Sequence, residues 1–318
     1  MRAIPLLTLL LGGWFVVPAH ADEAQDWLTR LGQAEQQQSF YGTFVYERNG
    51  SFSTHNIWHR VQDGKVRERL LQLDGSAQEV VRIDGHTQCV SGTLIAGLGD
   101  SPNSAARALD PQKLKNWYDL AVIGKSRVAG RAAVIVSLTP RDQHRYGFEL
   151  HLDKETGLPL KSLLLNDKGQ LLERFQFTQL DTTDVPSDKD LQPGSDCKAV
   201  TLDSDKASAA KVTQAWHSDW LPPGFELTSS TARKDPETKT QVNSLMYDDG
   251  LARFSVFLEP LNGATVTDTR TQLGPTVAVS RRLTTPQGEV MVTVVGEIPI
   301  GTAERIALSM RTDATASK

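Results

Sequence analysis

The chain has 318 residues and a formal net charge of −4, with 39% hydrophobic and 23% charged residues. This composition is that of a globular protein, and it argues against long disorder, collagen-like repeats and coiled-coil rods. The charge shows no basic excess, so we expect no nucleic-acid partner. The length allows one large domain or two ordinary ones, each able to bury a core.

The first 21 residues have the pattern of a secretory signal peptide. Arg2 precedes an apolar run over residues 4–17, and Ala19-His20-Ala21 has the small-x-small pattern that signal peptidase recognises. The run is shorter than the ~20 residues that a membrane span needs, which disfavours the alternative of an uncleaved anchor. We therefore expect an exported, soluble mature chain that begins near Asp22.

Export bears on the two cysteines, Cys89 and Cys197. In an oxidising compartment a lone pair of cysteines usually forms a disulfide. The two residues are 108 positions apart, and the chain-entropy model gives a closed loop of this length ~4–5 kcal/mol of stabilisation. We expect this disulfide, and two buried free thiols are the alternative.

The mature chain is predicted to open with a helix over residues 23–38. Trp27, Leu28, Leu31 and Ala34 fall on one face at helical spacing, and Asp22 is the candidate cap.

The hydrophobic period then changes to that of strands. Dipeptides that tolerate the positive φ angles of hairpin turns separate the runs, namely Asn49-Gly50, Asp63-Gly64, Asp74-Gly75 and Asp84-Gly85. This regular spacing predicts an antiparallel meander.

Residues 97–118 interrupt the strands, and a short helix is predicted over residues 112–120. Strand patterns resume at residues 132–140, 145–153, 158–166 and 170–180. One helix with about nine strands favours a strongly curved sheet that holds helices in its concavity. We assign residues 22–183 to this first domain.

Residues 184–210 are polar and rich in turn formers, which is typical of a linker. The second domain, residues 211–318, is predicted to contain strands at 220–227, 242–260, 276–285 and 289–298. A closing helix is expected over residues 301–311, with Thr302 as its cap. The fold class is therefore mainly β (α+β), a large antiparallel sheet with covering helices plus a smaller antiparallel sheet with a C-terminal helix.

Catalytic and metal signals are weak throughout the sequence. It contains no G-x-S-x-G elbow and no H-E-x-x-H helix. His55 and His59 have the spacing of a metal pair only on a helix; on a strand four residues span ~13 Å, too far for one ion. We predict no catalytic residue, no metal ligand and no cofactor.

Basic residues suggest a binding surface instead. Lys65, Arg67 and Arg69 alternate, so a strand places them on one face, where Arg60 and Arg82 of neighbouring strands are candidates to join them. Such a patch suits an acidic peptide or phosphorylated headgroups. A solvated sheet face is the alternative. In the second domain, Arg282 is a further candidate.

The sequence resembles the RseB/MucB family of periplasmic negative regulators of an envelope-stress sigma factor. Three blocks carry most of the resemblance: WLPPGFELTSS (220–230), YDDGLARFSVFLEP (247–260) and VGEIPIGTAERIALSM (295–310). The segment SFYGTFVYERNGSFSTHNIWHRV supports it more loosely. These blocks are characteristic of the family, and they are not signatures of a particular reaction.

The resemblance implies a large domain like the lipoprotein carrier LolA, an open half-barrel with helices over its mouth. It also implies that the protein binds the periplasmic segment of a membrane anti-sigma factor and shields it from site-1 protease until lipid or lipopolysaccharide releases it. In the MucB branch the regulated output includes alginate production. Self-association is a further implication.

We expect the partner segment at the domain junction. Candidate residues of the apolar half-barrel wall are Phe40, Phe44, Tyr46, Ile57 and Trp58, although structural core is an alternative role for them. Two other functions stay open, a periplasmic lipid or lipoprotein carrier and an exported hydrolase.

Overall fold

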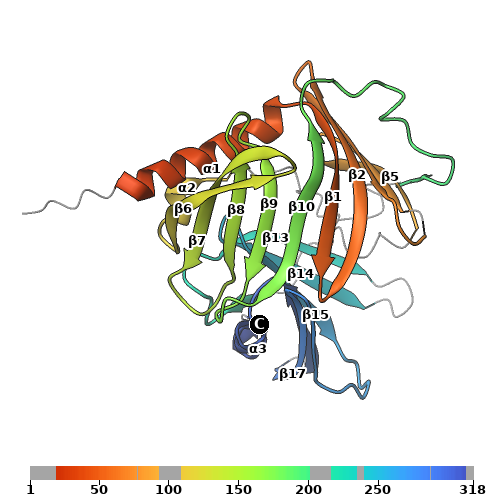
Figure 1. Cartoon of the computed structure of the whole chain (residues 1–318). Helices are drawn as coiled ribbons and strands as arrows, with labels where there is room; N and C mark the ends of the chain where they lie inside the picture. The colour runs from red at the N-terminus through yellow and green to blue at the C-terminus, as the bar shows by residue number, and fades with distance from the viewer. Residues whose placement is uncertain are drawn as a thin grey trace, which may run out of the picture.

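The computed structural model describes residues 19–76, 78–92, 109–200, 216–234, 240–286 and 288–312. It contains a large and a small antiparallel sheet, each packed against a helix (Figure 1). The fold class predicted from the sequence is thereby confirmed. Residues 1–18, most of the predicted signal peptide, lie outside the described part. Within that part, no helix has the length and apolar character needed to cross a membrane.

The first helix, α1 (Ala19–Gln37), begins earlier than predicted. Asp22 therefore lies in its first turn and is not the cap, and its charge is favourable there because the helix dipole is positive at this end. The apolar face is as expected, since Trp27, Leu28 and Leu31 are buried against β6 and β7.

The large sheet has eleven strands in the order β11-β5-β4-β3-β2-β1-β10-β9-β8-β7-β6. Two runs of hairpins, β1 to β5 and β6 to β10, are joined where β10 pairs with β1. The sheet curls, so that β6 also contacts β10. The strands are β1 (Phe40–Arg48), β2 (Ser51–Gln62), β3 (Lys65–Gln72), β4 (Glu79–Ile83), β5 (His86–Ser91), β6 (Tyr118–Val128), β7 (Arg131–Pro140), β8 (Gly147–Asp153), β9 (Pro159–Leu165), β10 (Leu171–Asp181) and β11 (Lys198–Ala199).

Three of the four predicted tight turns have the expected geometry. Asn49, Asp63 and Asp84 have φ near 50°, and the glycine after each also has a positive φ, as a two-residue hairpin turn requires. At Asp74-Gly75 only the glycine has a positive φ, and the connection from β3 to β4 is longer, over residues 73–78. The meander is confirmed, with one loop in place of a tight turn.

The helix predicted over residues 112–120 is wrong beyond its first turn. α2 covers only Pro111–Leu114, where Asp110 accepts hydrogen bonds from the backbone of Gln112 and Lys113, and Tyr118 already begins β6. A register shift near Ile123 breaks the alternation of β6, and its turn uses Ala129 at positive φ instead of asparagine or aspartate. The usual strand and turn signals are therefore absent there.

The second domain holds a six-stranded sheet in the order β13-β14-β15-β18-β17-β16 and a two-stranded β12-β19 ribbon. The elements are β12 (Trp216–Ser218), β13 (Glu226–Lys234), β14 (Gln241–Asp248), β15 (Arg253–Pro260), β16 (Thr269–Leu273), β17 (Thr276–Thr285), β18 (Gly288–Gly296), α3 (Ile300–Ser309) and β19 (Met310–Thr312).

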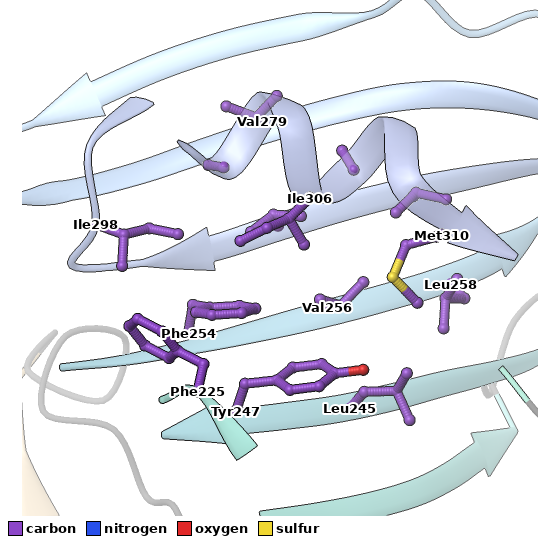
Figure 2. Close-up of a cluster of buried hydrophobic side chains, with 14 of the residues drawn as sticks. Phe225, Leu245, Tyr247, Phe254, Val256, Leu258, Val279, Ile298, Ile306 and Met310 are labelled. Carbon is purple, nitrogen blue, oxygen red and sulfur yellow. The ribbon is translucent and has the colours of Figure 1, made fainter. Parts of the chain in front are cut away.

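The core of this domain lies between α3 and one face of the sheet. Figure 2 shows Ile298 and Ile306 on the same side as Phe254, Val256 and Leu258 of β15, and all five side chains are buried. Full burial of side chains of this size is worth about 1.5–3 kcal/mol each, so this cluster is what holds α3 on the sheet.

Two details of the second domain differ from the prediction. The strand predicted over residues 220–227 is right only for its last two residues, because Pro222, Pro223 and Gly224 (φ 89°) form a turn and β13 begins at Glu226. Thr302 is not the helix cap: the capping position is Pro299, without a side-chain hydrogen bond, and Thr302 lies buried in the first turn.

Candidate functional site

Four of the five candidate wall residues share the face of the large sheet that carries α1. The register places Phe40, Phe44, Tyr46 and Ile57 on the face of His59, whose Nε2 contacts the α1 backbone. Trp58 is on the opposite face, so its assignment to this wall is wrong. Phe40 and Phe44 are only 8% and 7% exposed and pack on Phe177, which makes them core residues.

The two histidines of β2 have protein partners of their own. His59 Nδ1 lies 2.9 Å from a Glu68 carboxylate oxygen, and His55 Nε2 lies 2.8 Å from the Ser53 hydroxyl. Both rings stack on phenylalanines, at Phe40 and Phe44. In the described part of the chain, no cluster of three His, Cys, Asp or Glu residues has the arrangement of a metal site.

The six candidate cationic residues do not form one patch. Lys65, Arg67 and Arg69 share a face with Arg60, which lies directly opposite Arg67. Arg82 faces Glu68 on the other side of the sheet. Arg282 lies in the second domain, in β17, 3.8 Å from Glu289.

The polar segment after β10 covers the arginine face. Asp188 Oδ1 accepts hydrogen bonds from Arg60 at 2.6 Å and Arg67 at 3.2 Å, and the Asp190 carbonyl accepts one from Arg69. Hydrogen bonding by Arg60 lowers the pKa of the Asp188 carboxyl. These arginines thus bind the chain's own backbone and carboxylate.

A disulfide anchors the end of this covering segment. Cys89 of β5 and Cys197 are bonded, with their Cα atoms 5.5 Å apart, and β11 then pairs with β5. The predicted linker, residues 184–210, is therefore attached to the first domain as far as residue 200.

The junction between the two domains is held by a buried ion pair. The Arg145 guanidinium donates to Asp249 Oδ2 at 2.6 Å and to the Pro223 carbonyl at 2.6 Å, and both charged side chains are 0% exposed. Tyr118 also donates to Asp249, and burial raises the pKa of that tyrosine. This pair, whose members are 104 residues apart, was not predicted from the sequence.

Glycine and arginine contacts extend the junction on either side of the pair. A Cβ on Gly224 would lie 2.3 Å from the Trp117 ring, so the second domain meets that indole with backbone. Arg48 of β1 pairs with Glu297 at 3.6 Å and also bonds Thr276. The two domains therefore meet through polar and apolar contacts spread over several elements.

A hollow of about 500 Å³ opens at this junction. Both domains line it, and the first turn of α3 forms one side. Arg305 lies over the Trp220 ring, 3.8 Å from its centroid, and His144 Nδ1 lies 3.1 Å from the Thr302 hydroxyl. The lining residues are Gln143, His144, Tyr146, Asn166, Asp167, Leu172, Gln272, Pro299, Ile300, Gly301, Thr302 and Arg305.

Burial shifts two titrating groups of this hollow. It lowers the pKa of His144, against the opposing effect of Asp142, and it raises the pKa of Tyr146 to about 12. Neutral His144 and protonated Tyr146 are therefore the forms present at neutral pH. Tyr146 donates to the Ile298 carbonyl, so it too joins the domains.

The lowered pKa of His144 predicts a pH effect on stability. Between its folded pKa and the unfolded value of about 6.5, the unfolded chain binds more protons, so this residue makes stability fall as pH decreases. In His144→Gln, the loss of stability on acidification from about pH 7.5 to about pH 5.5 is expected to be smaller. Urea titrations at both pH values measure this, and an unchanged pH dependence would contradict it.

The fold and junction define a two-domain β-sheet protein with a buried ion pair and a hollow of about 500 Å³ where the domains meet. The chain belongs to the MucB/RseB family: the model of the MucB/RseB N-terminal domain matches residues 23–195, and that of the C-terminal domain matches residues 210–311.

Named relatives agree with this membership. The sigma factor AlgU regulatory protein MucB of Pseudomonas aeruginosa is 63% identical over the full length of both chains. The sigma-E factor regulatory protein RseB of Escherichia coli is 28% identical, with 89% of each chain covered.

Solved structures are similar over most of the chain. The complex of P. aeruginosa MucA and MucB matches with a TM-score of 0.82 and 63% identity, covering 92% of this chain and 100% of that one. A structure of MucB matches with a TM-score of 0.68 and 60% identity, covering 92% and 98%.

Proposed function

We propose that this chain is a periplasmic negative regulator of a sigma factor of the AlgU or sigma-E type. It acts by binding the periplasmic segment of a membrane anti-sigma factor and denying site-1 protease access to it. It breaks no bonds itself. The similarity to MucB in complex with MucA, at 63% identity over 92% of the chain, is the observation that carries this proposal.

The junction hollow is the proposed binding site of the partner segment. It has walls from both domains, and its side-chain amides, among them Gln143 and Gln272, suit an extended backbone. A segment bound there would contact the two domains at once, so its affinity depends on the interdomain contacts of Arg145 and Tyr146.

Release by lipid or lipopolysaccharide completes the proposal. A ligand can release the anti-sigma segment only if it binds the free form of this protein better than the partner-bound form. Each buried acyl CH₂ is worth ~0.8 kcal/mol, so a few buried carbons shift this balance tenfold or more. The predicted output of the release, as in the MucB branch, is sigma-factor activity that includes alginate production.

Filling the hollow is expected to weaken partner binding. Gly301 is exposed in the first turn of α3, and a Cβ there meets no atom within 4 Å. Gly301→Trp should therefore fold normally and lower the affinity for the anti-sigma segment by about tenfold or more, about 1.4 kcal/mol. Titration calorimetry with the purified periplasmic segment measures the change.

The control variant is Leu308→Trp, at an exposed position nearer the other end of the same helix. It should bind like the unaltered protein. If the unaltered protein does not bind the segment, the regulator proposal fails and the alternative, a lipid or lipoprotein carrier, is favoured. If both tryptophan variants bind the segment normally, the junction hollow is not its binding site.

A further inference from the structure

A second hollow, of about 530 Å³, lies within the first domain. It shares no lining residue with the junction hollow, and it sits between the β6–β7 turn and the turn after β8. Its lining residues are Arg127, Gly130, Arg131, Ala132, Asp153, Lys154 and Glu155.

Positive charge dominates around this hollow. Its lining has three cationic residues, Arg127, Arg131 and Lys154, and two carboxylates. One of the carboxylates, Asp153, is buried and hydrogen-bonded to Arg131 and Thr156. Burial alone would raise the pKa of Asp153, but hydrogen bonds from Arg131 and Thr156 outweigh it and hold the pKa below its usual value. The negative charge of Asp153 is thus balanced by Arg131 within the lining of the hollow.

A fourth cation stands behind the turn. Arg30 of α1 donates to the carbonyls of Lys154 and Glu155, at 3.2 and 3.3 Å. Glu155 is 82% exposed, and its carboxylate pairs with Arg131 at 3.0 Å. The local balance of four cations to two carboxylates favours an anion in the hollow.

One donor atom of these cations has no hydrogen-bond partner in the described part of the chain. Arg131 Nε is buried there without a hydrogen-bond acceptor, although Nη2 of the same group bonds Asp153 and Glu155. A buried donor without an acceptor is destabilising, and an acceptor oxygen that reaches it would remove this penalty. Arg127 and Lys154 are exposed and line the same hollow, and Arg127 Nη1 donates to the Gly130 carbonyl at 3.0 Å.

The walls are held in place without a ligand. Asp153 Oδ2 accepts from the Thr156 backbone and hydroxyl, at 3.1 and 2.7 Å, which fixes the turn after β8. The opposite turn has open space above Gly130, where a Cβ would meet no atom within 4 Å. A preformed cradle of this kind binds with little ordering cost.

We propose that this hollow is a binding site for a phosphate group, either a free phosphate ester or the phosphate of a lipid headgroup. Arg127 and Arg131 bind its oxygens through guanidinium N–H groups, and the Lys154 ammonium adds a point charge. The site does not depend on the partner segment, so it stands or falls separately from the regulator proposal.

The first test is a titration of the ¹⁵N-labelled full protein with inorganic phosphate at constant ionic strength, followed at the Gly130 amide. A saturable shift is expected. In Arg127→Ser/Lys154→Ser the affinity should fall by about tenfold or more. A matched control, Lys168→Ser/Arg233→Ser, removes the same charge at exposed positions elsewhere and should leave the affinity within about twofold.

The second test distinguishes the sources of phosphate. Vesicles of phosphatidylcholine alone and vesicles that also contain phosphatidic acid are floated with the protein. Retention by the acidic vesicles, lost in Arg127→Ser/Lys154→Ser, assigns a lipid headgroup; a phosphate shift without retention assigns a free phosphate ester. No saturable shift with no retention, or equal losses in the control variant, would overturn the site.

Discussion

Arg145→Ala is expected to lower the free energy of unfolding by about 3–5 kcal/mol. The variant leaves the Asp249 carboxylate buried without its counter-ion, at a site where both side chains are 0% exposed. It also removes a donor to the Pro223 carbonyl and a cation packed on the Phe225 ring, 5.1 Å from its centroid. Urea titration followed by tryptophan fluorescence measures the loss.

Arg141→Ala is the matched control, because it removes an arginine four positions earlier. Arg141 pairs with Asp119 at 2.8 Å, but these side chains are 51% and 67% exposed, and such surface pairs are worth only about 0–1 kcal/mol. If Arg145→Ala costs no more than Arg141→Ala, the buried pair does not hold the domains together.

Replacing both Cys89 and Cys197 by serine is expected to cost about 4–5 kcal/mol of unfolding free energy. The disulfide closes a loop of 108 residues, so its loss frees the unfolded chain of a long-range constraint. It also removes the covalent anchor of the segment that pairs Asp188 with Arg60 and Arg67. The measurement is urea unfolding of the oxidised protein beside the double variant.

Reductant supplies the control for this prediction. The unaltered protein in reductant should unfold like the double serine variant, and reductant should not change the variant further. Equal stability of the oxidised protein and the double variant would show that the crosslink contributes nothing.

Local sequence signals were enough to predict the meander and the disulfide. Asn49-Gly50, Asp63-Gly64 and Asp84-Gly85 adopt positive φ angles with little strain, so each dipeptide by itself indicates a hairpin. By contrast, β6 was missed because a bulge near Ile123 interrupts its period.

The cationic patch was only partly predictable because register is not a local property. The alternation of Lys65, Arg67 and Arg69 correctly places them on one face, but the side on which Arg82 falls depends on the loop over residues 73–78. A slip of one residue there would reverse the face.

The partners of the predicted site residues were also outside the reach of sequence reasoning. Asp188, which covers Arg60, comes 128 positions later, and the Arg145–Asp249 pair joins two separate domains. Neither contact leaves a periodic pattern. The family block over residues 247–260 contains Asp249, but only the structure shows that this aspartate is buried.

The most direct test of the central claim is a protease-protection assay. The periplasmic segment of the anti-sigma factor is cut by site-1 protease alone, with this protein, and with this protein plus lipopolysaccharide. The account predicts that saturating protein slows cleavage in proportion to the fraction of segment bound, and that lipopolysaccharide restores it. An unchanged cleavage rate at saturating protein would contradict the account.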